Sequence, residues 1–360
     1  MELEAIIKQF PQIGQTAEIK PLTSGFINRT YVVVSENPAA PDYILQRINH
    51  QVFRNIDLLM HNIETVTRHV YDKLKAAHTS DIDRKVLRFL PTTEGKIYYF
   101  DGEGYWRACL FIPHSKTLNA VTPETSYLVG LKFGEFESML ADVPEKLGEP
   151  IPDFHNMELR LRQLREAVTA NPVGRLNEVR SIVDDIEKDA KEMCKAEELY
   201  RQGLLPKRIC HCDTKVSNML FDEETDEVLC VIDLDTVMPS FVFSDFGDFL
   251  RSAANPAPED EPDLTKIRFD MEIFRAFAKG YLESAKSFLT PIEIDNLPYA
   301  ATLFPYMQAV RFLADYINGD TYYQIRYETH NLVRTKAQYQ LFREAVKAVP
   351  AMKAYIESIR

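Results

Sequence analysis

The sequence predicts an α+β protein with two lobes, a small mainly β lobe followed by a larger mainly α lobe. Up to residue 112, short apolar or β-branched runs alternate with turn residues, which is the pattern of strands. After residue 113, long stretches carry apolar residues at helical spacing, interrupted by one β segment from Ile209 to Leu234. We therefore expect an N-terminal lobe over residues 1–112 and a C-terminal lobe over residues 113–360.

The N-terminal lobe is expected to combine a sheet with two helices. A short amphipathic helix is expected before Pro11, because apolar side chains gather on one side of this segment. A longer helix is expected over Asn55–Ala77, where apolar residues recur at helical spacing. The expected strands are Glu18–Leu22, Thr30–Val34, Tyr43–Ile48, Val86–Leu90, Ile97–Phe100 and Trp106–Ile112.

The C-terminal lobe is expected to be built from long helices around the β segment. Apolar periodicity indicates each of them, and a loop rich in proline and acidic residues lies between the third and the fourth. The expected helices are Pro123–Leu140, Met157–Thr169, Val179–Gln202, Phe269–Phe288 and Ile292–Ile317.

Composition excludes several classes of protein. The formal charge of −12 and the isoelectric point near 5.3 disfavour a nucleic-acid partner, which needs clustered basic residues. No membrane association is expected, because no apolar run approaches the ~18 residues of a spanning helix and no signal peptide is visible. The five cysteines are odd in number and sparse, which favours a reducing cytoplasm. Cys210 and Cys212 flank His211, but no second cluster completes a zinc site, so we expect buried thiols.

The most informative segment is Ile209–Thr236. Asp213 is followed five positions later by Asn218, and an apolar strand then ends at Asp233. Phosphoryl transfer uses one carboxylate to accept or orient the proton of the attacking hydroxyl, and an amide oxygen and a second carboxylate to hold Mg²⁺. Asp213, Asn218 and Asp233 suit these roles in that order.

His211-Cys212-Asp213 followed by Asn218 resembles the H-x-D-x-x-x-x-N catalytic loop of kinases. Aminoglycoside and choline phosphotransferases share this loop, usually with Gly or Asn at the position of Cys212. The resemblance implies a bilobal protein-kinase-like fold with ATP as co-substrate. The Asp-Phe-Gly at residue 245 opens a helical segment instead of closing a strand, so we interpret Asp245 as a helix cap or a brace for the catalytic loop. For Asp235, contact with a second Mg²⁺ and a solvated position both remain open.

The nucleotide is expected to contact the N-terminal lobe. The predicted phosphate loop contains Ser24, Gly25, Phe26 and Asn28 between two strands. The lysine that kinases place two strands later is replaced by Gln46 and Arg47, which strand alternation puts on opposite faces. Arg47 could supply the charge of that lysine, and Glu64 in the following helix could orient Arg47 through an ion pair. Backbone groups near Phe111 and Pro113, where the lobes join, are expected to face an adenine.

Over nearly the whole chain, the sequence resembles the N-acetylhexosamine 1-kinases of the aminoglycoside phosphotransferase superfamily. SGFINRTYVV, YILQRIN, HCDTKVSN, VIDLDTVMP, SDFGDFLR and RFLADYINGDTYY carry the resemblance. It implies phosphorylation of the anomeric hydroxyl of N-acetylglucosamine or N-acetylgalactosamine. By the same resemblance, Asp213, Arg311 and Tyr322 are the sugar-binding positions. Phe26 and Ser252 depart from the family pattern, and His155 is expected to brace a loop.

Two other functions are compatible with these motifs. A kinase for a cationic acceptor, such as an aminoglycoside or choline, would suit an acidic protein, but it would need acidic or aromatic groups around the cation. A pseudokinase that binds nucleotide without turnover would explain the missing lysine. The complete set of Asp213, Asn218 and Asp233 argues against it.

Overall fold

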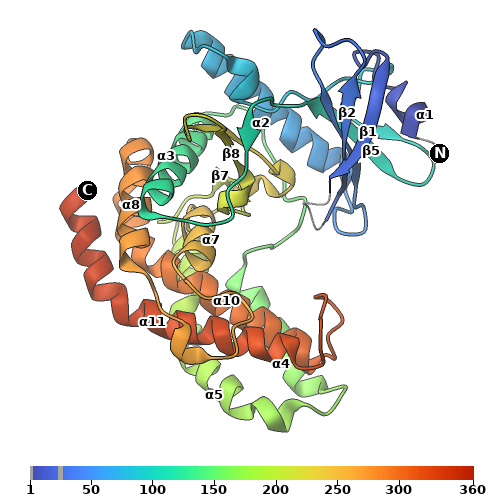
Figure 1. Ribbon diagram of the computed structural model, residues 1–360. Coiled ribbons are helices and arrows are strands. Elements are labelled where there is room, and N and C mark those ends of the chain that lie inside the picture. Colours follow the sequence, from blue (N-terminus) through green and yellow to red (C-terminus); the bar gives the residue numbers. More distant parts are fainter. Residues whose placement is uncertain (1–2, 23–26) are drawn as a thin grey trace. The chain divides into compact units, whose positions relative to one another are not determined.

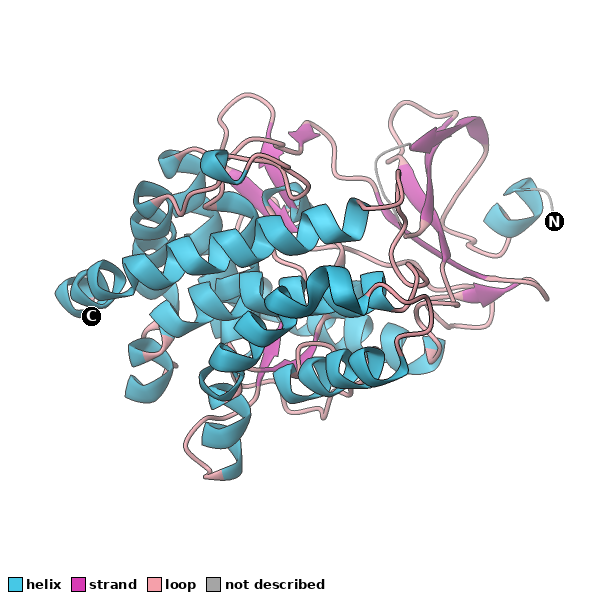
Figure 2. Ribbon diagram, turned by 90° about the horizontal axis from the view of Figure 1, so that it is seen from below, coloured by secondary structure: helices cyan, strands magenta, loops and turns pink. Residues whose placement is uncertain are grey.

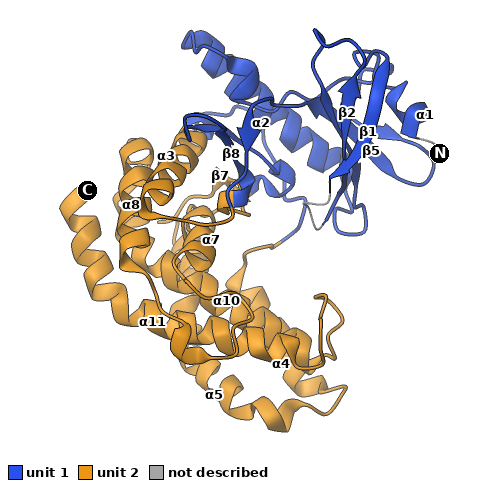
Figure 3. Ribbon diagram, in the orientation of Figure 1, with its two compact units in different colours: residues 1–118, 139–152, 217–238 blue, residues 119–138, 153–216, 239–360 orange. Residues whose placement is uncertain are grey.

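The computed structural model describes residues 3–22 and 27–360, and it divides the chain into two compact units (Figure 3). Unit 1 comprises residues 1–118, 139–152 and 217–238, and unit 2 comprises residues 119–138, 153–216 and 239–360. Unit 1 holds most of the strands, whereas unit 2 is mainly helical (Figure 2). This confirms the predicted α+β class with a small β part and a larger α part. The units are discontinuous in sequence, so two segments from beyond residue 112 belong to unit 1.

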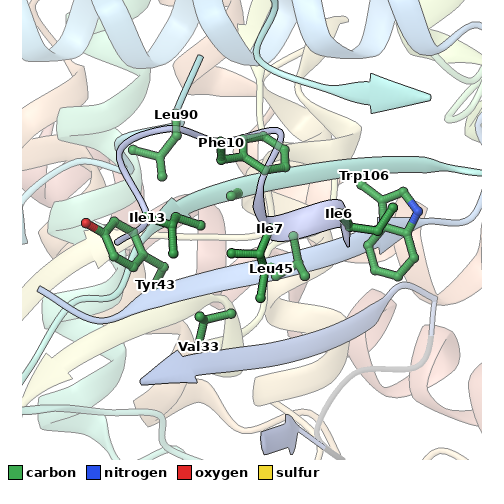
Figure 4. Packing of buried hydrophobic residues seen from close by; sticks show 10 residues of the cluster. Ile6, Ile7, Phe10, Ile13, Val33, Tyr43, Leu45, Leu90 and Trp106 are labelled. Atoms are coloured by element: carbon green, nitrogen blue, oxygen red, sulfur yellow. The ribbon is translucent and has the colours of Figure 1, made fainter. Parts of the chain in front are cut away.

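A five-stranded antiparallel sheet of order β1-β2-β3-β5-β4 forms the first part of unit 1 (Figure 1). One face of this sheet is covered by the N-terminal helix α1, Leu3–Ile7, and the turn after it. Ile6, Ile7 and Phe10 pack there against Leu45 and Trp106 (Figure 4). The strands are β1 (Thr16–Leu22), β2 (Arg29–Ser35), β3 (Tyr43–Ile48), β4 (Tyr99–Phe100) and β5 (Tyr105–Leu110).

The long helix α2, Ile56–Ala76, follows β3 in the chain. The Asn55 side chain caps its N-terminus by accepting a hydrogen bond from the Leu58 amide at 3.0 Å. Asn62 of α2 donates to the carbonyl oxygens of Gly148 and Val237, both at 2.9 Å. This one buried amide therefore holds together the three chain segments that make up unit 1.

A second sheet in unit 1 has the order β6-β8-β9. Its strands are β6 (Ser115–Lys116), β8 (Met219–Asp222) and β9 (Val228–Val231). The β8–β9 hairpin pairs Met219 with Val231, so the residues just before β8 and just after β9 lie at the same end of the hairpin. Asn218 and Asp233 of the predicted catalytic segment lie at this end of the hairpin.

Unit 2 packs around helix α10, Leu297–Ile317, which is buried along nearly its whole length. Gly247 allows α7 to approach α10, because a Cβ at this position would lie 2.4 Å from the Ala300 carbonyl oxygen. In the described residues, no helix is both long and apolar enough to cross a membrane. The other elements are α3 (Pro123–Leu140), α4 (Met157–Ala170), α5 (Leu176–Met193), α6 (Lys195–Arg201), β7 (Arg208–Cys210), β10 (Met238–Ser240), α7 (Phe243–Ala253), α8 (Met271–Ala285), α9 (Pro291–Asp295) and α11 (His330–Ile359).

Four expected elements differ in the structure. The helix expected over Ile292–Ile317 divides at Asn296 into α9 and α10. The strand expected over Val86–Leu90 is reduced to a single bridge between Phe89 and Cys109. The strand expected over Ile97–Phe100 keeps only its last two residues. The helix expected over Val179–Gln202 divides at Cys194, whose amide bonds to Lys191 O, three residues back, and so tightens the last turn of α5. Apolar spacing continues across this break, which is why periodicity alone did not indicate it.

Candidate active site

The loop after β7 carries the predicted proton acceptor, and a buried carboxylate holds its backbone. The two oxygens of Asp245 accept hydrogen bonds from the amides of His211 and Cys212, both at 2.7 Å. The Thr214 hydroxyl donates to the Asp245 carbonyl oxygen at 2.7 Å. Asp245 lies in the first turn of α7 and does not cap it. Of the two roles considered for Asp245, the structure therefore has the brace.

The loop has an unusual backbone at Cys212, where φ is +64°. This left-handed conformation disfavours most side chains and suits glycine or asparagine, which explains why related loops use those residues there. The buried His211 accepts the Asp213 amide on Nδ1 at 3.2 Å, and its ring packs edge-on against Phe133. His211 and Asp245 together therefore fix the backbone from which the Asp213 side chain extends.

The Asp213 carboxylate faces charged neighbours within unit 2. Lys215 Nζ lies 2.9 Å from Asp213 Oδ2, a pairing that the motif did not indicate. Asp248 and Arg251 of α7 form an ion pair at 3.0 Å. Burial raises the pKa of Asp248, and the charges of Arg251 and Asp213 act on it in opposite senses. The predicted proton acceptor is thus one member of a polar group that continues onto α7.

A second buried acid, Glu137 of α3, supports the brace. Burial raises the pKa of Glu137 well above its usual value, the nearby Asp245 adds to the shift, and Tyr281 donates to Glu137 Oε2 at 2.5 Å. Burial therefore favours the protonated form of Glu137, which can donate to Asp245. Cys210 Sγ also lies close to both carboxyl groups. Because these oxygens are used inside the protein, the cluster braces the loop and is a poor cation site.

The two predicted metal ligands lie together in unit 1. Asn218 immediately precedes β8, Asp233 follows β9, and the Ile232 amide donates to the Asn218 carbonyl oxygen at 3.0 Å. Asp233 has a left-handed backbone with φ of +61°. An amide oxygen and a carboxylate at one end of a hairpin are hard oxygen donors, which is the ligand chemistry that Mg²⁺ prefers. The residues therefore fit a magnesium ion.

Asp235 is neither solvated nor open to a second metal ion. It is 3% exposed and pairs with Arg107 of β5, whose Nη1 lies 2.5 Å from Asp235 Oδ1. Asn28 Nδ2 donates to the other oxygen at 2.6 Å, and Arg107 Nε donates to Gln46 Oε1 at 2.9 Å. Sequence analysis did not assign a role to Arg107, because an arginine in a mainly apolar strand gives no motif.

The hydrogen bonds around Asp235 distinguish Gln46 from Arg47, the two residues considered as replacements for the missing lysine. The Gln46 side chain lies on the side of the sheet where Arg107 pairs with Asp235. The Arg47 guanidinium instead lies over the Trp106 ring, 5.7 Å from its centroid. The expected ion pair of Arg47 with Glu64 is not formed within the described chain, and Glu64 is exposed. Strand alternation thus separates the two side chains as expected, and Gln46, together with Asn28, shares the network of Asp235 whereas Arg47 does not.

The other predicted nucleotide contacts stay predictions. Ser24, Gly25 and Phe26 lie outside the described residues. At the junction after β5, the Phe111 amide donates to the Asp42 carbonyl oxygen at 2.9 Å, and the Pro113 carbonyl oxygen accepts from Arg84 Nε at 3.1 Å.

The two predicted sugar ligands, Arg311 and Tyr322, lie near each other in unit 2. The Arg311 guanidinium is 5.6 Å from the ring centroids of both Phe154 and Tyr323, and the Tyr322 ring contacts Tyr323 edge-on at 4.8 Å. Tyr322 is 71% exposed, so the group is open to solvent. The buried Asp315 accepts the amides of Thr321, Tyr322 and Tyr323 at 2.8 to 3.0 Å and thereby fixes this loop.

His155 and Arg160 lie beside Arg311 and Phe154, and the sequence did not predict that these residues come together. The His155 ring stacks on Phe154 at 4.4 Å and contacts Phe304 edge-on at 4.8 Å. Burial lowers the pKa of His155 well below its usual value, and the charges of Arg311, Arg160 and Arg251 lower it further. Arg251 also pairs with Asp248, on which the charge of Asp213 acts, so the charges around Asp213 and around His155 influence one another within unit 2.

Comparison with known proteins places the chain in a family. Residues 18–285 match the model of the phosphotransferase enzyme family. This match covers well over half of the chain, so the protein belongs to that family, and the predicted membership of the aminoglycoside phosphotransferase superfamily is confirmed. The protein is therefore a phosphotransferase.

Solved structures share its kinase-like fold. An aminoglycoside phosphotransferase from Alicyclobacillus acidocaldarius is 14% identical, with a TM-score of 0.60 and 99% and 97% of the two chains covered. A choline kinase from Cryptosporidium parvum is 14% identical, with a TM-score of 0.60 and 99% of both chains covered. An ethanolamine kinase from Plasmodium vivax is 15% identical, with a TM-score of 0.54 and 91% and 84% covered.

Proposed function

We propose that this phosphotransferase moves the γ-phosphoryl group of MgATP to the anomeric hydroxyl of an N-acetylhexosamine, giving the sugar 1-phosphate. Asp213 accepts the proton of the attacking hydroxyl and orients its oxygen. Arg311 donates to hydroxyl or acetyl oxygens, and Tyr322 supplies a flat face and a polar tip. We also propose a cytoplasmic location, supported by five cysteines that are all free thiols.

In this proposal Asn218 and Asp233 hold the magnesium ion, and Asn28 and Gln46 lie on the nucleotide side of the β3 face. Bound Mg²⁺ would neutralise negative charge on the phosphate groups. The protein's own contribution is to hold the Asp213 backbone through Asp245 and His211, so that its carboxylate needs little reorganisation to accept the proton.

The observation that carries the choice of acceptor is the positive charge around Arg311. Arg160, Arg251 and Arg311 lie close enough to the uncharged His155 ring to lower its pKa, and Arg160 and Arg311 form no ion pair with a described carboxylate. Such a group repels the ammonium groups of choline, ethanolamine or an aminoglycoside. A sugar rich in hydroxyl and acetyl oxygens instead accepts hydrogen bonds from it. The pseudokinase alternative is disfavoured because the Asp213 loop is braced in detail, which nucleotide binding alone would not require.

The proposal is tested by incubating the protein with ATP, Mg²⁺ and a panel of acceptors, and following products by phosphorus NMR. We expect an acid-labile sugar 1-phosphate from N-acetylglucosamine or N-acetylgalactosamine, and no turnover of choline or an aminoglycoside. A 6-phosphate product would contradict the anomeric assignment, and a phosphorylated cationic acceptor would contradict the choice of acceptor.

The role of Asp213 is tested in the Asp213→Asn variant. Its kcat should fall by about 10²- to 10⁴-fold, the usual range for a lost general base, with nucleotide binding unchanged. Lys215→Gln, which removes the charge that pairs with Asp213, is the matched control and should lose much less activity. Near-normal single-turnover phosphoryl transfer in Asp213→Asn would remove this residue from the mechanism.

A further inference from the structure

Among the described residues, neither Arg160 nor Arg311 forms an ion pair with a carboxylate. Arg160 donates to the carbonyl oxygens of Phe154 at 2.5 Å and Asp153 at 3.3 Å and to the Gln163 side chain at 3.0 Å. Arg311 donates to Gln308 at 3.2 Å and lies over two aromatic rings. All of these partners are neutral groups. By contrast, the neighbouring Arg251 pairs with both Asp248 and Glu259.

Two buried polar atoms of the same group also have no partner. Within residues 3–22 and 27–360, neither Nδ1 of His155 nor Nε of Arg160 has a hydrogen-bond partner. Most buried polar atoms in folded proteins are hydrogen-bonded, and an orphan that persists indicates a site that something else completes. These two atoms belong to side chains that meet around Phe154, which stacks on His155, accepts from Arg160 and lies under Arg311.

The electrostatic consequence is visible on Arg160. Burial, followed by the charge of Arg311, lowers the pKa of Arg160 to about 10, and Tyr323, Tyr322 and Asp153 oppose this shift less strongly. The two guanidinium groups therefore repel each other across a partly buried space. Natural proteins keep such unfavourable charge where a ligand of opposite charge compensates it.

We propose that His155, Arg160 and Arg311 form an oxyanion-binding subsite in unit 2, and that it holds a negatively charged substituent of the acceptor. Two guanidinium groups provide planar pairs of donors that match sulfate, phosphate or carboxylate oxygens. The neutral His155 ring, which stacks on Phe154 and meets Phe304 edge-on, adds one more donor without a third full charge. The statement about the acceptor rests on the proposed function, whereas oxyanion binding itself does not.

Oxyanion binding is measured by titrating the full chain with sodium sulfate in a calorimeter at constant ionic strength, with chloride as reference. We expect saturable sulfate binding that weakens by about 10- to 100-fold in Arg160→Gln, the range for losing hydrogen bonds to a charged group. The matched control is Arg162→Gln, because Arg162 is an exposed arginine on the same helix. Absence of saturable binding, or an equal loss in both variants at unchanged thermal stability, would overturn the subsite.

The source of the oxyanion is tested by turnover. N-acetylglucosamine 3-sulfate and 6-sulfate are compared with N-acetylglucosamine, and we expect at least one sulfated sugar to have the lower KM. Arg160→Gln should remove that advantage while leaving the KM for ATP unchanged. Free sulfate should raise the KM of the acceptor only. If neither sulfated sugar has an advantage, the acceptor part is wrong. If no N-acetylhexosamine reacts at all, the proposed function fails while the calorimetric result still decides the subsite.

Discussion

Arg107 in unit 1 and Arg160 in unit 2 show two opposite treatments of an arginine that is withdrawn from water. Arg107 is 3% exposed, and its guanidinium is paired with the Asp235 carboxylate and the Gln46 amide. Arg160 is partly buried, contacts only neutral oxygens, and faces a second guanidinium. The first arrangement compensates the charge inside the protein, and the second leaves it uncompensated.

The difference separates structural charges from binding charges. Removing a charge from water costs several kcal/mol unless a partner compensates it, so a chain selected for stability alone would pair every such group. Arg107 joins β5 to the segment after Asp233 and needs no ligand. Arg160 and Arg311 retain a repulsion that a ligand can relieve. The same chain therefore contains both cases, which makes the contrast directly testable.

The largest loss of stability is expected when the ion pair of Arg107 with Asp235 is broken. Arg107→Leu leaves Asp235 buried without its counter-charge, and unfolding in urea should show a loss of about 3–5 kcal/mol in the free energy of unfolding. The double variant Arg107→Leu with Asp235→Leu should recover part of this loss, because it removes the uncompensated charge as well. A single variant that loses less than the double variant would show that the pair does not compensate these charges.

Glu137 is a third kind of buried ionisable group, because burial favours its uncharged form. Its pKa in the folded protein lies well above 4.5, mainly because of burial. Above that pH the unfolded chain loses this proton and the folded protein keeps it, so the free energy of unfolding falls as pH rises. Glu137→Gln removes this dependence. Relative to wild type, its stability should therefore rise as the pH increases above 4.5.

Parallel urea titrations of wild type and Glu137→Gln at several pH values check this difference. The glutamine amide can donate to Asp245 while its oxygen accepts from Tyr281, so the brace of the catalytic loop is retained. A constant difference between the two proteins across this pH range would mean that Glu137 is ionised in the fold.

Asp315 shows a fourth treatment, in which hydrogen bonds satisfy a buried carboxylate. Its oxygens accept three consecutive amides, of Thr321 to Tyr323, and the Asn331 side chain. In Asp315→Asn one oxygen becomes a donor that faces other donors, and stability should fall by about 1–2 kcal/mol. Since this loop carries Tyr322, the KM of the acceptor should rise while the KM for ATP is unchanged. A fall in kcat with both KM values constant would contradict a positioning role.

The sequence predicted the order of elements and the catalytic segment because both depend on local pattern. Periodicity and turn residues indicated β1 to β3, α2 and α3, and motif spacing indicated Asp213, Asn218, Asp233 and the bracing Asp245. These signals are local in the chain, and the motif residues all lie in the segment from residue 213 to residue 245. The boundary at residue 112 stays a prediction, and the contact-based units are discontinuous, because residues 217–238 return to unit 1.

The charge pairings could not be predicted in the same way. Arg107 and Asp235 are 128 residues apart in the chain, and Arg311 meets Phe154 from a helix that lies far beyond it in sequence. No local pattern distinguishes a paired arginine from an unpaired one. Asp235 was open between a metal contact and a solvated position, and His155 was interpreted as a loop brace, because both depend on partners that only the folded chain brings together.

The smallest effect on stability, and the sharpest test of the contrast, is expected at Arg160. Arg160→Gln removes one of two repelling charges, which stabilises the fold, but it also loses hydrogen bonds to Phe154 and Asp153. Because these effects oppose each other, the free energy of unfolding should change by less than about 1 kcal/mol in either direction. Arg107→Gln, the same exchange at the paired site, should be clearly destabilising because Asp235 then lacks its counter-charge. Added sulfate should stabilise wild type against thermal unfolding more than Arg160→Gln, because a ligand that binds only the folded state raises its stability. If Arg160→Gln is as destabilising as Arg107→Gln, and sulfate stabilises both proteins equally, then Arg160 is a structural charge and the distinction between the two arginines is wrong.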